Sequence, residues 1–188
     1  MALTVRPVDA ASFADVQKVF GERGQAHRCQ CQGFRQSWHA LHTDNVDGRR
    51  ELLRDQVAEG HGLLARLDDD PVGWCSLGPR SDYPYLRRPV WAGRSEDKHD
   101  PTVWAVTCFV TRVGFRNQGV SRALAAATVD AARDAGARAV EAYAMNPEPG
   151  KDVTWGELHV GKLTVFLAAG YRIVHTPSLR RAIVRHDF

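Results

Sequence analysis

Residues 104–143 constrain the fold of this chain more than any other stretch. They begin with an apolar run, residues 104–110, which is rich in strand-forming residues and too short for a typical helix, so it predicts a buried strand. Gly136 is a typical helix stop, and residues 138–144 read as a second strand. The residues between the strands follow a period close to 3.6, with Ala123, Leu124, Ala127, Ala131 and Ala135 on one side. Strand, helix and strand at this length predict a right-handed crossover between two parallel strands.

The turn between the first strand and the helix has the features of a phosphate site. Gly119 has no Cβ, so a ligand can approach the backbone closely there. The N–H groups of residues 118–121 have no partners within the helix and lie at the positive end of its dipole, and Arg116 adds a cation. The stretch contains neither a Gly-Lys-Ser/Thr ending nor G-x-G-x-x-G, which excludes two other phosphate loops.

The sequence of this turn, Arg-Asn-Gln-Gly-Val-Ser over residues 116–121, resembles the Q/R-x-x-G-x-G/A motif of the GNAT superfamily of acetyl-CoA-dependent N-acyltransferases. Ser121 stands where the motif usually has a second glycine or an alanine. The resemblance implies that acetyl-CoA is the co-substrate and that its pyrophosphate binds here. It assigns the cofactor contacts to Phe109, Val110, Thr111, Arg116, Asn117, Gln118, Gly119, Val120, Ser121 and Asn146. The alternative is an ordinary strand–helix–strand unit with a glycine turn, in which Asn146 is a turn residue.

The segments before the crossover predict a strand, helices and a hairpin. In order these are a strand (residues 4–8), a helix from a Ser12 cap to residue 20, a polar loop (21–33), an amphipathic segment (34–41), a helix (48–59) capped by Asp47, and antiparallel strands at 62–67 and 72–77. Residues 78–101 form a long connection rich in proline, and such loops are often functional.

After the crossover, an apolar stripe predicts a last helix that ends at Gly170, and a closing hairpin pairs residues 171–174 with 182–185 across Thr176-Pro-Ser178. Residues 166–171, Phe-Leu-Ala-Ala-Gly-Tyr, resemble the Y-x-x-x-G-F/Y signature of the same family. We expect an α/β (α+β) fold: one mixed, mostly antiparallel sheet of six or seven strands, with a central parallel crossover and helices on both faces. Residues 1–188 are expected to form a single GNAT-like domain.

Composition excludes several classes of protein. The chain of 188 residues is 44% hydrophobic and 25% charged, which is ordinary for a soluble globule. The net charge of +3 is mild and no run of lysine and arginine occurs, so we expect no nucleic-acid partner. The N-terminus lacks the apolar core of a signal peptide and no apolar run could span a membrane, so we expect a cytoplasmic protein, as a monomer or homodimer.

Cys29 and Cys31 form a C-x-C pair, with His27 beside them and His39 and His42 downstream. Zinc sites usually have two to four residues between paired cysteines, and no second cysteine pair completes a tetrahedral set. We therefore expect no bound metal, and we interpret Cys75 and Cys108 as small core residues.

The resemblance implies direct attack of an amine on the acetyl thioester, between the diverging ends of the two parallel strands. Relatives often carry a carboxylate base on the strand before the motif, but Thr107 lies near that place, so the catalytic candidates are Glu141 and His159. Glu141 has the alternative of being a paired core charge. Relatives commonly place a tyrosine at position 166 to protonate the thiolate, and Phe166 cannot donate a proton. Either Tyr143, another hydroxyl or water replaces it, or the thiolate leaves unaided.

The acceptor is expected to be an amine of a small molecule or a protein, and an aromatic wall would suit a flat or apolar amine. The candidates for this wall are Trp38, Trp74, Tyr83, Tyr85, Trp91 and Trp104, although most of them are also plausible core residues. The competing interpretation is a CoA-binding sensor or accessory protein without efficient transfer, which the missing tyrosine and the missing strand carboxylate support.

Overall fold

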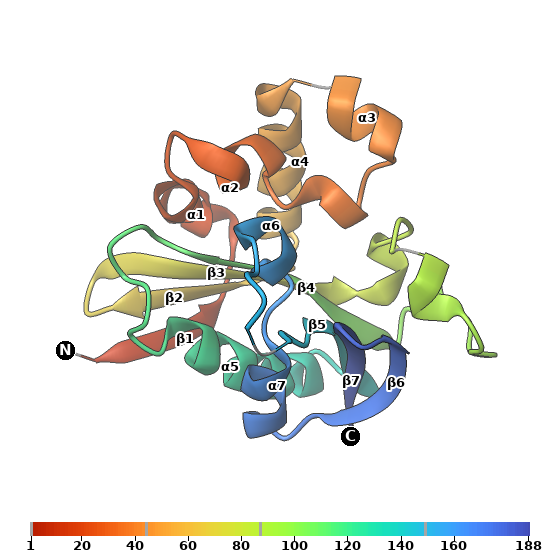
Figure 1. Cartoon of the computed structure of the whole chain (residues 1–188). Helices are drawn as coiled ribbons and strands as arrows, with labels where there is room; N and C mark the ends of the chain where they lie inside the picture. Colours follow the sequence, from red (N-terminus) through yellow and green to blue (C-terminus); the bar gives the residue numbers. More distant parts are fainter. Residues whose placement is uncertain (1, 44, 87, 149) are drawn as a thin grey trace.

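A mixed sheet of seven strands forms the centre of the protein, as the sequence predicts (Figure 1). The computed structural model describes residues 2–43, 45–86, 88–148 and 150–188. The strand order is β1-β2-β3-β4-β5-β7-β6, in which β4 and β5 are parallel and all other neighbours are antiparallel. The strands are β1 (Leu3–Pro7), β2 (Leu63–Leu67), β3 (Asp70–Pro79), β4 (Val103–Thr111), β5 (Ala139–Met145), β6 (Arg172–Ser178) and β7 (Arg181–Asp187).

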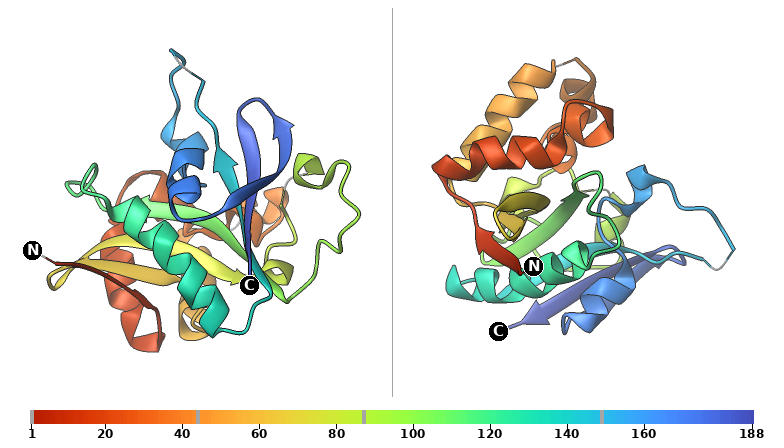
Figure 2. Two further views of the ribbon diagram at one scale, coloured as in Figure 1. Left: turned by 90° about the horizontal axis from the view of Figure 1, so that it is seen from below. Right: turned by 90° about the vertical axis from the view of Figure 1, so that its left-hand side faces the viewer.

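Helices cover both faces of the sheet (Figure 2, right). One face carries α5 (Val120–Asp134), the crossover helix, together with α7 (Leu163–Ala168). The other face carries α1 (Phe13–Phe20), α2 (Gly24–Cys29), α3 (Trp38–Thr43) and α4 (Val46–Ala58). Short helical turns lie at η1 (Ala10–Ser12), η2 (Gln32–Phe34), η3 (Arg80–Asp82), η4 (Arg88–Trp91) and α6 (Trp155–Leu158). Among the described residues, none of these helices has the length and hydropathy that a membrane crossing requires.

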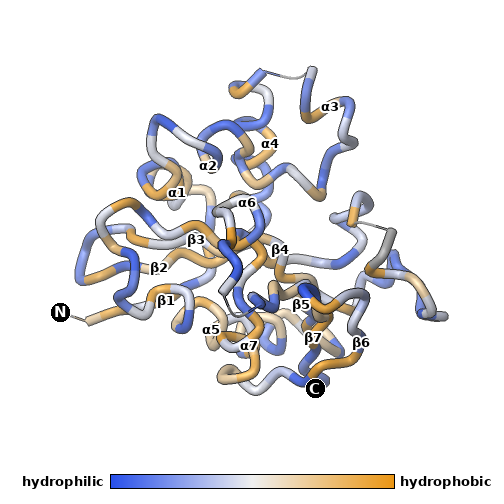
Figure 3. The backbone as a smooth tube through the Cα atoms, viewed as in Figure 1, coloured by the Kyte–Doolittle hydropathy of each residue, from blue (hydrophilic) through white to orange (hydrophobic). Residues whose placement is uncertain are grey.

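Alternating residues of the strands supply two large cores, and a third, smaller cluster contains Ala105, Tyr143 and Ile183. The tube of Figure 3 is most hydrophobic along the strands between the helical layers. Phe109 of β4 packs with the alanine-rich side of α5, whereas its neighbours Cys108 and Val110 pack with α1 and α4. This alternation is the period of two expected of a strand that is covered on both sides. It places one face of β4 toward the crossover helix and the other toward the N-terminal helices.

The N-terminal region is more helical than the sequence predicts. Residues 21–33 were expected to be a loop, but they contain α2 and most of η2. The side chains of Gln30, Cys31 and Gln32 are buried there, and such tertiary contacts override weak local helix propensity. Helix α4 also begins earlier than predicted, because the side chain of Asn45, not of Asp47, accepts the backbone N–H of Gly48 at 2.7 Å.

The closing hairpin is confirmed, but its turn lies later than predicted. Strand β6 runs through Thr176, Pro177 and Ser178, and residues 179–180 form the turn. Proline is tolerated in β6 because this strand is the last in the sheet, where a missing N–H breaks no ladder.

Close packing of β3 against the start of α5 gives a test of this arrangement. A Cβ on Gly73 would lie 2.4 Å from Cγ1 of Val120 and 3.1 Å from Cδ1 of Leu124. We expect Gly73→Ala to lower the free energy of unfolding by about 1–3 kcal/mol, because α5 must move away from the sheet. Denaturant titration measures this difference. Gly48→Ala in helix α4 is the control, because a Cβ there would lie 3.4 Å from a single atom, Oδ1 of Asn45. This substitution should not lower the free energy of unfolding. Equal stability of the two variants would contradict the packing described.

Candidate functional site

The parallel strands β4 and β5 diverge in the middle of the sheet. Their pairing extends from Val103 opposite Ala139 to Val106 opposite Ala142, although β4 continues to Thr111 and β5 to Met145. On the other side of β4, the register with β3 jumps from Cys108 to Val106, so Thr107 is an extra residue that forms a β-bulge. Bulges bend a strand and recur beside active sites. The bulge at Thr107 therefore coincides with the point where the two strands separate.

The backbone of residues 159–162 lies in the gap between the diverging strands. Phe109 donates its N–H to the carbonyl of His159 at 2.6 Å, and Met145 donates its N–H to the carbonyl of Gly161 at 2.8 Å. A parallel bridge pairs Met145 with Lys162. The family resemblance assigns Phe109 a cofactor contact, but in this structure its backbone N–H is already engaged within the chain.

The turn into α5 has the backbone geometry expected of it. Gly119 is the residue before the helix and has φ of +81°, the left-handed conformation that glycine adopts without strain. No atom outside its neighbours lies within 4 Å of the position of a Cβ on Gly119. The first N–H groups of α5 have no partners within the helix, and they lie at its positive end. The turn is therefore open to an anionic ligand.

A groove of about 600 Å³ lies in front of this turn, between the start of α5 and the chain that leads from α6 into α7. The sequence predicts seven residues that line it: Phe109, Thr111, Arg116, Asn117, Gly119, Val120 and Ser121. His159, which the sequence proposes as a catalytic residue, lines it as well. The opposite wall consists of Leu158, Gly161, Lys162, Thr164 and Val165, which the sequence does not predict because only the folded chain brings them there.

Three cations surround the groove. Arg116 and Arg122 come from the turn and from the first turn of α5, and Lys162 from the opposite wall. Among the described residues, none of the three has a carboxylate partner within 4.0 Å. Most other described arginines have one, for example Arg50, Arg80, Arg94 and Arg185. Unpaired cations around a helix N-terminus make a site for a polyanion.

Three further predicted contacts are not among the residues that line the groove. Val110 faces the N-terminal helices. Gln118 donates its side-chain amide to the carbonyl of Gly114 at 3.1 Å. Asn146 donates its side-chain amide to the carbonyl of Leu179 at 3.1 Å and its backbone N–H to the carbonyl of Arg180 at 2.9 Å, which ties β5 to the β6–β7 turn. The contacts of Asn146 favour the alternative of a turn residue.

A second cavity, which we call the apolar pocket, has a volume of about 430 Å³ and adjoins the groove at His159. Its floor is the face of β4 that carries Cys108 and Val110. Its other described lining residues come from the N-terminal helices, from Tyr85 and from the segment before α7: Phe20, Gln25, Ala26, Cys29, Cys31, Gly33, Phe34, Gln36, Trp38, Leu41, Gly156 and His159.

His159 occupies the junction of these cavities. It lines the groove, the apolar pocket and a third cavity of about 300 Å³ that contains Tyr143. Its ring lies over that of Phe34, with ring centres 5.9 Å apart. Its Nδ1 lies 2.7 Å from the carbonyl of Gly156, and because a carbonyl only accepts, Nδ1 carries the proton. In the neutral ring, Nε2 is therefore the basic nitrogen.

Glu141, the other catalytic candidate, is completely buried and surrounded by arginines. Its two carboxylate oxygens accept from Arg94 at 3.1 and 2.7 Å, and Arg185 donates at 2.6 Å. Arg80, also fully buried, lies 3.6 Å away. Glu141 lines none of the three cavities described above. This environment favours the alternative of a paired core charge.

Phe166 has no hydroxyl and is not among the residues that line the groove. Phe166 is fully buried and packs edge-on against Phe109 and Tyr171, with ring centres 5.6 and 5.3 Å away. Tyr143 faces the third cavity, and burial, followed by the nearby charge of Glu141, raises the pKa of its phenol well above the usual range. A phenol with a raised pKa is a weaker proton donor.

The predicted aromatic wall divides into pocket and core residues. Trp38 and Tyr85 line the apolar pocket and are 74% and 48% exposed. Trp74 and Tyr83 are buried core residues. Trp104 packs at its ring edge against His61, and the ring of Trp91 lies beneath the guanidinium groups of Arg80 and Arg94.

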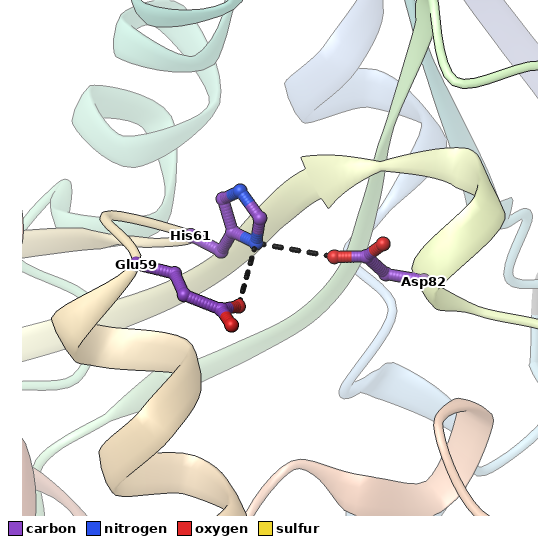
Figure 4. A group of neighbouring side chains, drawn as sticks. All are labelled: Glu59, His61 and Asp82. Atoms are coloured by element: carbon purple, nitrogen blue, oxygen red, sulfur yellow. Dashed lines mark ion pairs between the residues drawn. The ribbon is translucent and has the colours of Figure 1, made fainter.

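The cysteines are free thiols, and within the described residues neither Cys29 nor Cys31 belongs to a group with metal-site spacing. The group that has this spacing in the described chain is Glu59, His61 and Asp82 (Figure 4), in which Nδ1 of His61 lies 3.4 and 3.1 Å from the two carboxylates. Burial alone would raise the pKa of Asp82, but the hydrogen bond from His61 and the charge of Arg35 lower it overall. The cluster ties the end of α4 to η3.

Comparison with known proteins identifies the family. A model of the acetyltransferase (GNAT) family matches residues 26–150. The chain therefore belongs to the GNAT acetyltransferases. The comparison with curated proteins found no match.

Solved structures of acetyltransferases share the fold over the whole chain. PaiA N-acetyltransferase from Thermoplasma acidophilum, in complex with coenzyme A, is 10% identical, with a TM-score of 0.55 and 100% of both chains covered. The polyamine N-acetyltransferase of Drosophila melanogaster is 12% identical, with a TM-score of 0.57 and 100% of both chains covered. The ribosomal-protein-alanine N-acetyltransferase of Brucella melitensis is 13% identical, with a TM-score of 0.56 and 98% of this chain and 99% of that chain covered. Because the names of the last two proteins refer to different acceptors, the shared fold does not define the acceptor here.

Proposed function

We propose that this protein is an N-acetyltransferase that moves an acetyl group from acetyl-CoA to the nitrogen of an amine. The observation that carries the proposal is the junction at His159, where a groove with three unpaired cations meets an apolar pocket. A polyanionic donor fits the first cavity and an acceptor the second. Structures of similar fold, PaiA among them, are complexes with coenzyme A, which supports the same donor here.

The groove supplies the binding energy for the donor. The N–H groups at the start of α5 would donate hydrogen bonds to the pyrophosphate oxygens, and Arg116, Arg122 and Lys162 would neutralise its charge. The absence of a side chain on Gly119 allows the phosphate to approach the backbone. Acetyl-CoA supplies an activated acyl group as a thioester.

In the reaction, the amine nitrogen attacks the thioester carbonyl, a C–N bond forms, and the C–S bond breaks. We propose that Nε2 of His159 accepts the proton that the nitrogen loses, because the bond from Nδ1 to Gly156 leaves Nε2 as the basic nitrogen. The thiolate leaves and takes its proton from water, since Phe166 has no hydroxyl. For the Phe109 N–H to stabilise the oxyanion, it must first release the carbonyl of His159.

His159→Gln tests the assignment of the base. We expect kcat to fall by roughly 10²–10⁴-fold, with little change in the KM for acetyl-CoA. His27→Gln is the matched control, because the Nδ1 of His27 also lies against a backbone carbonyl, that of Gly21, at 3.0 Å, and the residue lies outside the cavities described. If His159→Gln keeps the parent kcat, as His27→Gln is expected to, His159 is not the base.

A second candidate function is CoA binding without efficient transfer. The engaged N–H of Phe109 and the missing hydroxyl at Phe166 favour it. The two functions differ in turnover: a binding protein would bind acetyl-CoA and CoA stoichiometrically while releasing CoA no faster than the uncatalysed reaction with any amine.

A further inference from the structure

The residues that line the apolar pocket limit the class of acceptor that it can bind. The first relevant property is the charge of these residues. The described residues that line it include no aspartate, glutamate, lysine or arginine. Transferring an ammonium group from water into such an environment without a partner is strongly unfavourable. A polyamine or another polycation would therefore lose its hydration in the apolar pocket without gaining an ion pair.

The walls of the apolar pocket are aromatic rings and thiols. Phe34 lies against His159, and Trp38 and Tyr85 remain exposed although both are large and partly apolar. Cys29, Cys31 and Cys108 also line the apolar pocket, and Sγ of Cys31 accepts the indole N–H of Trp74 at 3.1 Å. Burial raises the pKa of the Cys29 thiol, which keeps it neutral. Rings and neutral sulfurs favour a flat, polarisable body.

The residues near the expected position of the reacting nitrogen also favour an acceptor that is not an ammonium ion. Thr107 occupies the bulge of β4, and Glu141 is held by three arginines, so neither is placed to remove a proton from an ammonium ion before attack. An aromatic amine is already neutral at physiological pH. It needs a base only for the proton that it loses during attack, which one histidine can accept.

Resting on the proposed function, we propose that the acceptor is an aromatic amine, uncharged at neutral pH, whose ring lies in the apolar pocket with its nitrogen toward His159. This assigns a substrate class to the pocket and predicts discrimination against cationic amines of the same size. The exposed rings of Trp38 and Tyr85 contact the outer part of the acceptor.

The experiment compares two isomeric amines, p-toluidine and benzylamine, which have the same atoms but differ in charge at neutral pH, with spermidine as the polycation. Acetylated product and released CoA are measured with the full chain and acetyl-CoA. We expect kcat/KM for p-toluidine to exceed that for benzylamine at least ~10-fold and that for spermidine at least ~100-fold. A preference for benzylamine or spermidine would overturn the assignment.

Two variants locate the effect in the apolar pocket. Trp38→Ala should raise the KM for p-toluidine several-fold without changing that for acetyl-CoA. Leu179→Ala, which removes another highly exposed apolar side chain but outside the pocket, should change neither KM. Gln25→Glu adds a carboxylate on an exposed residue of the lining, and it should raise kcat/KM for benzylamine relative to that for p-toluidine. An unchanged ratio of the two amines in both Trp38→Ala and Gln25→Glu would contradict this location.

A binding measurement separates failure of this inference from failure of the proposed function. If no amine is acetylated, the proposed function is wrong, and calorimetric titration of p-cresol, an unreactive isostere of p-toluidine, still tests the pocket. Saturable binding of p-cresol that is weakened by Trp38→Ala, and stronger than that of benzylamine, supports the inference. Stronger binding of benzylamine, or no binding of either compound, overturns it.

Discussion

Gly119→Asp should abolish high-affinity binding of CoA, with a loss of roughly a thousandfold. The new side chain would occupy the open space in front of the α5 turn, and its charge would lie beside the pyrophosphate. At an effective dielectric constant of ~20, one like-charge contact near 4 Å costs on the order of 4 kcal/mol, which corresponds to this loss. Arg116→Ala should have a smaller effect, because the backbone N–H groups remain. The measurement is calorimetric titration of CoA into each folded variant.

The control for Gly119→Asp is Gly136→Asp, at the other end of the same helix. Gly136 has φ of +79° and Gly119 +81°, and no atom crowds a Cβ at either position, so the two substitutions impose similar backbone strain. Aspartate adopts this conformation more readily than most residues, so both variants should fold. Gly136→Asp should bind CoA like the parent. Parent-like affinity of Gly119→Asp would show that the cofactor does not bind at this turn.

Glu141→Gln should cause a large loss of stability. Glu141 is fully buried, with Arg80, Arg94 and Arg185 around its carboxylate, and Glu96 is the other acidic member of this cluster. Removing one partner of a buried ion pair leaves uncompensated charge and typically costs about 3–5 kcal/mol. The same variant tests the catalytic alternative, because a purely structural Glu141 leaves kcat per folded molecule close to that of the parent. Denaturant titration and active-site-normalised turnover measure the two quantities.

Glu51→Gln is the control for Glu141→Gln. Glu51 pairs with Arg54 on the surface of α4, where both side chains are more than half exposed, and such pairs contribute about 0.5 kcal/mol or less. A loss of less than about 1 kcal/mol in Glu141→Gln would contradict the assignment of a buried charge cluster. If kcat of folded Glu141→Gln falls as much as kcat of His159→Gln, Glu141 has a catalytic role.

The crossover could be predicted from the sequence because its signals are local. The apolar run before the turn, the alanine stripe of α5 and Gly136 each specify one element without reference to the rest of the chain. The turn at Gly119 was predictable for the same reason, since glycine lacks the side chain that would close it. These signals also define one wall of the groove.

The other wall and the interior of the site depend on contacts between distant residues. Lys162 faces Arg116 only because residues 159–162 enter the gap between β4 and β5, and no local pattern specifies that path. The bulge at Thr107 arises from the register with β3, which is set along the whole hairpin. Glu141 could be read as a base or as a paired charge until the fold brought three arginines to it.

The most direct test of the proposed activity is mass spectrometry of a reaction that contains the full chain, acetyl-CoA and p-toluidine, with thiol release followed in parallel. We expect one molecule of the acetylated amide for each CoA released, at a rate that depends on His159 and on Gly119. Thiol release no faster than in the absence of protein, or release without amide formation, would contradict it.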